Sequence, residues 1–242
     1  MARLSRSKDR KVANAVSASG KTVKIANTFG LPAGKAFSCP NATSICERVC
    51  YAGKLEKIYK GTRDVLMRNW AILQECNDDI GAITDLLAEM ITEFRQDCDK
   101  HKAEYKFRIH WDGDFYSPAY TAAWREVILA NPDITFWVYT RVPSAVGILN
   151  GIDNLSLYFS TDTDNRQKAI GLRKEFDIKL AYLDMTFDEA KLSLQEATGI
   201  TGVRCPENNR AIPLISDKGS ACSVCNLCVV GRRDVLFSAS KK

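Results

Sequence analysis

Short β-rich runs alternate with amphipathic helical stretches along this sequence, and the alternation narrows the choice of folds more than any other feature. Apolar periodicity and capping residues predict helices over 62–76, 77–98, 117–131 and 186–199. The β-rich runs lie at 21–28, 105–111, 134–141, 155–160, 178–183 and 200–205. Strands that alternate with helices are joined by helical crossovers and therefore lie parallel. The sequence predicts an α/β protein with a parallel sheet.

The fold that we expect is a single-domain parallel (β/α) barrel, complete or partial, over residues 21–242, with a basic N-terminal segment at 1–20. A chain of 242 residues is long enough for one substantial core, and no repeat or linker divides it. An open doubly wound sheet is the alternative that the same alternation permits. In a barrel the first and last strands are neighbours, which would bring the cysteine-rich loops at 39–50 and 205–228 together.

Three of the predicted strands have one apolar face and one polar or aromatic face, and we expect the second face to line the interior of the barrel. At its carboxyl rim the predicted catalytic residues are His110, Asp112, Asp114, Tyr139 and Arg141. His110 is one of two histidines and ends a strand beside two carboxylates, so it is the candidate for proton transfer. The alternatives are a structural histidine bonded to Asp112 or Asp114, and a buried polar network with no substrate.

The nine cysteines divide into two kinds. Cys76 and Cys98 occupy the apolar stripes of predicted helices, where a free cysteine acts as a small hydrophobic residue. The other seven lie in loops, as the sets Cys39, Cys46, Cys50 and Cys205, Cys222, Cys225, Cys228. No signal peptide or membrane-length apolar run is present, so we expect a cytoplasmic protein without a membrane partner. Reducing conditions there favour metal binding over disulfides.

The spacing of the C-terminal cysteines favours an iron–sulfur cluster. The C-x2-C-x2-C triplet can supply three thiolates to a 4Fe-4S cube, with Cys205 as the fourth. The N-terminal trio would hold a second cluster with one iron left open, or would borrow a ligand. One or two clusters would then serve electron transfer or assist a reaction at the rim. The alternative is a zinc-stabilised nucleic-acid-binding module, although structural zinc prefers two cysteine pairs or added histidines.

The formal net charge of +5 is concentrated at residues 1–12 and 229–242. Terminal lysines and arginines are typical of solubilising tails, and contact with nucleic acid is the less favoured interpretation.

The linked order of LPAGKAFSCPNATSICERVCYAG, HWDGDFYS, FWVYTR, GVRCPENN and ACSVCNLC resembles the phage-encoded gene product 88 family over residues 21–238. That resemblance implies a protein of the infected bacterial cytoplasm. The layout is also similar to that of the radical S-adenosylmethionine enzymes, in which a partial barrel carries a C-x3-C-x2-C cluster motif after its first strand and often C-terminal auxiliary clusters.

This second resemblance implies particular roles. Cys46, Cys50 and Tyr51 match the first part of the cluster motif, while Gly53 stands at the third ligand position, so that Cys39 would replace it. Asp112, Gly113 and Asp114 stand for the motif that contacts the methionine part of S-adenosylmethionine. Such chemistry requires an iron that is open to the cofactor. The implied partners are an electron donor protein and a small-molecule or nucleotide substrate.

Overall fold

The computed structural model describes residues 2–240, and within them the main sheet has seven parallel strands in the order β3-β4-β5-β6-β7-β11-β8. The strands are β3 (Thr28–Gly30), β4 (Lys106–Asp112), β5 (Thr135–Thr140), β6 (Leu155–Thr161), β7 (Lys179–Asp184), β8 (Val203–Arg204) and β11 (Val235–Ser238). The α/β class and the parallel sheet are therefore confirmed.

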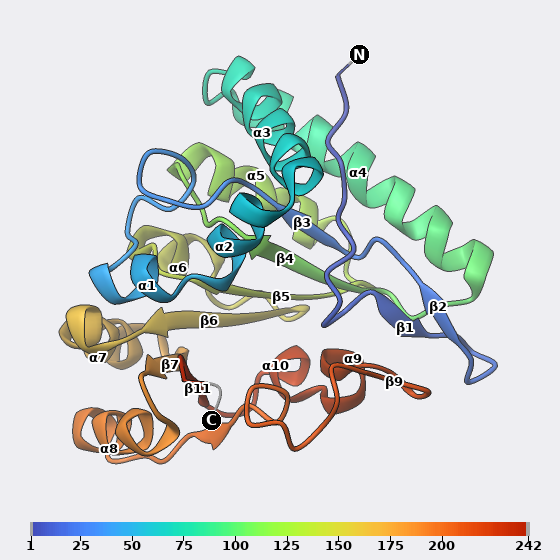
Figure 1. Ribbon diagram of the computed structural model, residues 1–242. Helices are drawn as coiled ribbons and strands as arrows, with labels where there is room; N and C mark the ends of the chain where they lie inside the picture. The colour runs from blue at the N-terminus through green and yellow to red at the C-terminus, as the bar shows by residue number, and fades with distance from the viewer. Residues whose placement is uncertain (1, 241–242) are drawn as a thin grey trace.

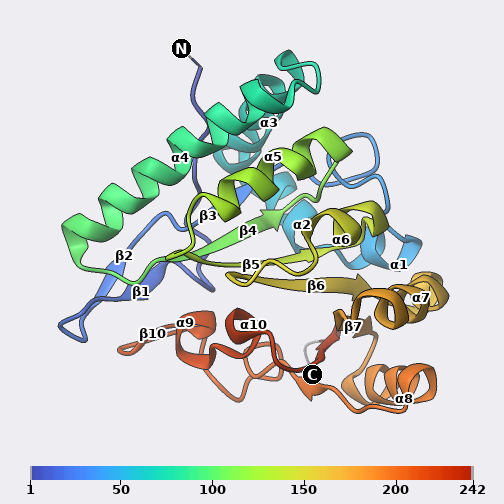
Figure 2. The same ribbon diagram turned by 180° about the vertical axis from the view of Figure 1, so that it is seen from behind.

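Helices lie on both faces of this sheet. The longer ones are α3 (Lys60–Glu75), α4 (Ile80–His101), α5 (Pro118–Leu129), α6 (Pro143–Leu149), α7 (Arg166–Phe176) and α8 (Phe187–Thr198). Figure 2 shows α4, α5 and α6 across one face. Figure 1 shows two short helices, α1 (Ser44–Val49) and α2 (Tyr51–Ile58), in front of the other. The second face also receives α9 (Ala221–Cys225) and α10 (Leu227–Val230), which follow the short hairpin β9 (Ile215–Ser216) and β10 (Gly219–Ser220).

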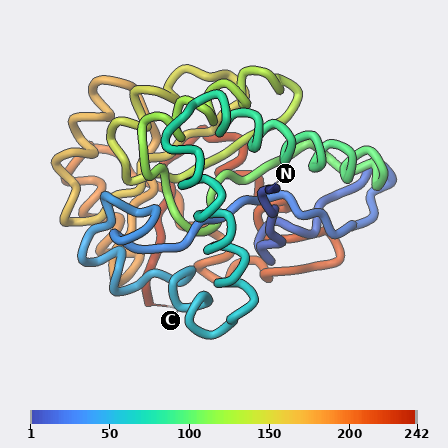
Figure 3. Tube along the Cα trace, turned by 90° about the horizontal axis from the view of Figure 1, so that it is seen from above, coloured from blue at the N-terminus to red at the C-terminus, as the bar shows by residue number. Residues whose placement is uncertain are grey.

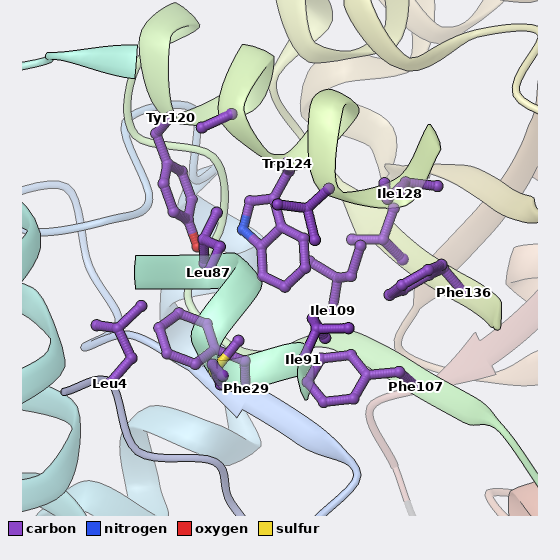
Figure 4. Close-up of a cluster of buried hydrophobic side chains, with 14 of the residues drawn as sticks. Leu4, Phe29, Leu87, Ile91, Phe107, Ile109, Tyr120, Trp124, Ile128 and Phe136 are labelled. Atoms are coloured by element: carbon purple, nitrogen blue, oxygen red, sulfur yellow. The ribbon is translucent and has the colours of Figure 1, made fainter. Parts of the chain in front are cut away.

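The largest apolar core lies between the sheet and the layer of α4, α5 and α6 (Figure 4). Phe107, Ile109 and Phe136 reach it from β4 and β5, and Leu87 and Trp124 reach it from α4 and α5. These side chains are at most 1% exposed. Burial of this size is the main stabilising contribution to such a sheet. Cys98 belongs to this core and Cys76 packs against it, as the helical spacing predicts.

The predicted helices appear with their expected caps. Ser117 caps α5 by accepting a hydrogen bond from the Tyr120 amide at 3.1 Å, and Pro118 takes the first helical position. Thr186 and Glu189 form the capping box of α8, and Gly199 ends that helix with a φ of 72°. The sequence patterns missed α6, α7 and β11.

The prediction of a complete barrel is wrong, because the sheet is open. The strand β3 stands at one edge and the two-residue β8 at the other, and β11 is inserted between β7 and β8. Ser7 covers the β3 edge instead, and its amide donates to the Thr28 carbonyl at 2.7 Å. At this edge of the sheet, the Thr28 carbonyl of β3 is therefore hydrogen-bonded by the N-terminal segment rather than by the last strand. The open parallel sheet leaves a partial barrel as a prediction, beside the open doubly wound sheet that the sequence also permits.

The basic segment at 1–20 is part of the fold. Within it, β1 (Asn14–Val16) pairs with β2 (Thr22–Lys24), and Leu4 and Val12 are buried. Arg6 forms an ion pair with Asp97 at 2.7 Å. The view from above in Figure 3 shows this segment beside the C-terminal segment, where the Cys222 amide donates to the Lys11 carbonyl at 2.9 Å. These contacts correct the expectation that the N-terminal charges form a solvated tail; Lys241 and Lys242 of the basic C-terminal end lie outside the described residues.

None of the helices within residues 2–240 is long and apolar enough to cross a membrane.

Candidate functional site

All seven loop cysteines line one cavity of about 380 Å³ on the face of the sheet opposite the main core. The N-terminal set reaches it from the loop before α1, from α1 and from the junction of α1 and α2. The C-terminal set reaches it from the end of β8 and from α9 and α10. The two sets converge even though the first and last strands are not neighbours. They converge because both loop systems cover the same face of the open sheet.

The strands β5 and β6 turn alternate side chains toward this cavity, as the sequence pattern predicts. Trp137 and Tyr139 pack with α10 on the cavity side, whereas Phe136 and Val138 enter the main core. On β6 the Ser156 hydroxyl donates to the Val229 carbonyl of α10 at 2.8 Å. Period-two alternation therefore separates the apolar layer from the cavity along both strands.

The strand β4 does not follow this rule, because it contains a bulge. Thr28 pairs with Arg108 and Gly30 with Asp112, so three residues of β4 lie opposite one residue of β3. His110, in the middle, has a φ of 57°, which is unusual for a residue other than glycine. The bulge ends the alternation, and Trp111 packs with Ala52 and Leu66 beside the cysteine loop.

The His110 ring consequently packs against Phe29, Phe115 and Trp124, and its Nε2 bonds the Tyr120 hydroxyl at 2.8 Å. Burial, with a smaller contribution from Arg108, lowers the pKa of His110 to about 3, so the ring is neutral. The alternative prediction was a structural histidine bonded to Asp112 or Asp114. His110 does form a buried hydrogen bond, but its partner is Tyr120. His110 also borders the cavity, and its Nδ1 has no hydrogen-bond partner among the described residues, so proton transfer by His110 stays a prediction.

The N-terminal trio is held by short helices and by hydrogen bonds from backbone amides. Thr43 caps α1 and accepts from the Cys46 amide at 3.1 Å. Cys50 ends α1 and begins α2, and its Sγ accepts a hydrogen bond from the Gly53 amide at 3.3 Å. Burial raises the pKa of Cys39, Cys46 and Cys50, so these thiols are protonated at neutral pH in the metal-free protein.

Asp114 and Arg141 form a buried network that positions Cys46. The carboxylate of Asp114 accepts from the Thr140 hydroxyl at 2.6 Å and from the Arg141 amide at 2.7 Å. The Arg141 guanidinium donates to Asp162 at 2.8 Å, and Asp162 also accepts from the Thr43 hydroxyl at 2.6 Å. Because Thr43 caps the helix that carries Cys46, the network fixes the position of this thiol. Arg141 also lowers the pKa of Cys46, against the larger effect of burial.

Asp112 lies beside a second carboxyl group, that of Glu56 on α2. The Asp112 Oδ1 accepts from the Gly113 amide at 2.9 Å, and Glu56 accepts from the Ala33 amide at 2.9 Å. Burial, together with the Glu56 carboxyl, raises the pKa of Asp112 well above its usual range. The raised pKa favours the neutral form of Asp112, whose Oδ2 has no hydrogen-bond partner among the described residues.

Gly113 allows the loop that carries Cys39 to approach β4. A Cβ at this position would lie 2.4 Å from the Ser38 Oγ and 2.9 Å from the Leu31 carbonyl, and φ is +83°. We predict that Gly113→Ala destabilises the fold by about 1–3 kcal/mol more than the control Gly151→Ala. Gly151 has a φ of +76° but nothing within 4 Å of the added Cβ, so it measures backbone strain alone. Urea unfolding of both variants tests this, and equal losses would contradict the close approach.

The C-terminal set is close-packed around Cys228. The left-handed Asn226, with a φ of 54°, separates α9 from α10, so that the triplet turns at this residue. Cys228 packs beside Cys205 and interacts electrostatically with Cys222 and Cys225. Burial raises the pKa of Cys222 and of Cys228 to about 12.

Two cations and a tyrosine adjoin this set. Arg108 lies over the Tyr139 ring at 5.5 Å and pairs with Asp9 at 2.9 Å, while its buried Nε has no partner among the described residues. Lys11 pairs with Glu207 at 2.8 Å. Tyr139 hydrogen-bonds Cys228, and Arg108 and Lys11 both counteract the effect of burial on the pKa of Cys222. The positive charges of Arg108 and Lys11 therefore favour the thiolate form of the nearby Cys222.

The sequence predicted that His110, Asp112, Asp114, Tyr139, Arg141 and the seven loop cysteines lie near one another, and all of them line the cavity. Four further residues of the site were not identified from the sequence. Asp9 and Lys11 belong to the basic N-terminal segment, and Thr43 and Glu56 lie close to the N-terminal cysteines in the sequence. A capping signal at Thr43 was visible in the sequence. Within the described residues, no three His, Cys, Asp or Glu side chains are arranged to hold a metal ion.

Comparison with known proteins assigns the chain to a family. The sequence profile described as Gene product 88 matches residues 2–231. The chain belongs to the gene product 88 family. It is 53% identical over 247 residues to the Gene 88 protein of Mycobacterium phage L5, and 51% identical over 248 residues to that of Mycobacterium phage D29. Both alignments cover 100% of each chain. No solved structure matches the chain significantly.

Proposed function

We propose that this gene product 88 protein is an iron–sulfur protein whose clusters bind in the cysteine-lined cavity. The observation that carries the proposal is the convergence of seven loop cysteines, from segments more than 150 residues apart, on one cavity. Reduced thiols in this number at one place are typical of metal sites, since unligated thiols are reactive. A 4Fe-4S cluster would supply one-electron redox chemistry or a Lewis-acidic iron there.

The C-terminal set provides the four thiolates that one 4Fe-4S cluster requires. Cys222, Cys225 and Cys228 would each bind one iron, and Cys205 would bind the fourth. Because no three cysteines of the described chain are arranged to hold a metal ion, cluster binding would require their side chains to rotate toward the cluster. The unpartnered Nε of Arg108 supports an anionic occupant, since a ligated cluster carries net negative charge.

The N-terminal trio provides three thiolates and would leave one iron open. Hydrogen bonds from amides, such as that from Gly53 to the Cys50 Sγ at 3.3 Å, stabilise thiolates and support ligation. An open iron beside a shared cavity is the requirement for radical S-adenosylmethionine chemistry, which is our second candidate. The open parallel sheet is compatible with it. The residues assigned to S-adenosylmethionine, Asp112, Gly113 and Asp114, all line the cavity, although the Asp114 carboxylate already accepts hydrogen bonds from Thr140 and Arg141.

Anaerobic purification with quantification of iron, sulfide and zinc tests the proposal. We expect about 4 iron atoms and 4 sulfides per cluster and a broad absorption band near about 400 nm, as is usual for thiolate-ligated cubes. Zinc alone, at about one ion per chain, would contradict it and favour the zinc-stabilised module. In the same preparation, a change in the electron paramagnetic resonance spectrum on addition of S-adenosylmethionine would support an open iron.

A further inference from the structure

We propose that the surface formed by the end of α1, α2 and the start of α3 is the docking site for a small acidic electron-donor protein. The inference rests on the proposed function, because it assigns the partner that reduces the cluster near Cys50. Its basis is a group of five exposed cations, which we call the basic surface: Arg48, Lys54, Lys57, Lys60 and Arg63. In Figure 1, α1 and α2 lie in front of the sheet and α3 lies above them.

The basic surface is unusual in its charge balance. Between residues 48 and 63 the sequence has five cations and a single carboxylate, Glu56. Glu56 is turned inward, where it accepts from the Ala33 amide and adjoins Asp112. Within the described part of the chain, no ion pair involves any of the five cations. The exterior of α2 is consequently positive without internal compensation, and it would attract an acidic partner over long range.

An apolar centre lies within these charges. Ile58 is 67% exposed and Tyr59 is 57% exposed, at the junction where α2 ends and α3 begins. Large apolar side chains that are surrounded by charged groups are typical of protein–protein interfaces, which have an apolar core and a polar rim. Ile58 cannot stack on a nucleic-acid base, so the composition favours a protein over a nucleic acid.

The basic surface is also connected to the candidate cluster. The helix α2 begins directly after Cys50, and the Gly53 amide in its first turn bonds the Cys50 Sγ. Tyr51, at the start of the same helix, lines the cavity and donates to the Trp111 carbonyl at 3.0 Å. An electron-donor protein bound over Ile58 and Tyr59 would thus be separated from the cluster at Cys50 by the length of α2. One electron would pass from its reduced flavin to the oxidised cluster, and no bond would form or break.

The test uses a bacterial flavodoxin as the acidic probe and the triple variant Lys54→Glu, Lys57→Glu, Lys60→Glu. The matched control is Lys168→Glu, Lys174→Glu, Lys191→Glu, which makes the same change in charge at exposed positions of α7 and α8. We expect flavodoxin binding, measured by calorimetry in the oxidised state, to weaken at least about tenfold in the first variant only. Reduction by flavodoxin should slow by a similar factor, while reduction by dithionite stays the same.

The outcomes separate the two proposals. If the first variant and the control variant bind flavodoxin equally well and are reduced by it at equal rates, the proposed docking site is wrong. This holds even if the protein contains iron. Tight binding of a single-stranded oligonucleotide, lost with the three lysines while flavodoxin does not bind, would overturn it in favour of a nucleic-acid surface. Iron-free protein that still binds flavodoxin through this surface would instead overturn the proposed function alone, since calorimetry does not require a cluster.

Discussion

The double variant Cys222→Ser, Cys225→Ser should lose about half of its bound iron and sulfide, close to 4 atoms of each from about 8. Both residues line the cavity on α9, and Cys228 and Cys205 alone cannot hold a cube. The N-terminal trio lies on separate elements, α1 and the loop before it, so its cluster should remain. Metal analysis of the anaerobic protein, together with the intensity of the reduced resonance signal, measures the loss.

The control for this experiment is Cys76→Ser. Cys76 ends α3, and its thiol donates to the Ile72 carbonyl at 3.5 Å, a role that a hydroxyl can retain. Iron content should therefore match that of the unaltered protein. Full iron in the double variant would mean that Cys222 and Cys225 are not ligands. Loss of all iron would mean that the two cysteine sets share one cluster, against the division proposed here.

The variant Asp162→Ala should destabilise the protein by about 3–5 kcal/mol, because it leaves a buried cation without its partner. The side chain of Asp162 is 0% exposed and that of Arg141 is 8% exposed, and they pair at 2.8 Å. Asp162 also accepts from the Thr43 hydroxyl, so its loss should loosen α1 and with it Cys46. The free energy of unfolding from urea titration measures the first effect. Selective loss of iron from the N-terminal site measures the second.

Asp133→Ala is the matched control, since Asp133 pairs with Arg95 at the surface, where the two side chains are 48% and 31% exposed. Exposed pairs contribute little, and its loss should cost less than about 1 kcal/mol. The double variant Arg141→Met, Asp162→Ala should recover part of the stability, because it removes the unpaired charge. Equal effects of Asp162→Ala and Asp133→Ala would contradict the role of the buried network.

The sequence was informative wherever local chemistry decides the structure. The serine cap and proline at 117–118 and the capping box at 186–189 predicted helix starts correctly, since these signals act within one turn. The strand β11 was missed because its four residues, Val235–Ser238, are too short for a periodicity to appear. Its insertion beside β7, which keeps the sheet open, depends on pairings across the whole chain that no local pattern encodes.

The cysteines of the candidate site could be predicted from the sequence, but the orientation of His110 and the contribution of the N-terminal segment could not. Seven thiols in two loops indicated one site, and both loops do line one cavity. Strict alternation along β4 predicted that His110 faces the cavity with Arg108. His110 does border the cavity, but the bulge also packs its ring against the aromatic core. A bulge is a property of the β3–β4 pairing and leaves no periodic signal. Lys11 and Asp9 were overlooked because a charged terminus resembles a solvated tail.

Anomalous diffraction at the iron absorption edge, from crystals of the anaerobically prepared protein, would show directly whether iron binds in the cysteine-lined cavity. It locates iron without assuming which residues bind it. We expect iron within bonding distance of the sulfur atoms of Cys205, Cys222, Cys225 and Cys228, inside the cavity that they line. A map that has no iron in this cavity, with the four thiols unligated or bound to a single zinc ion, would contradict it.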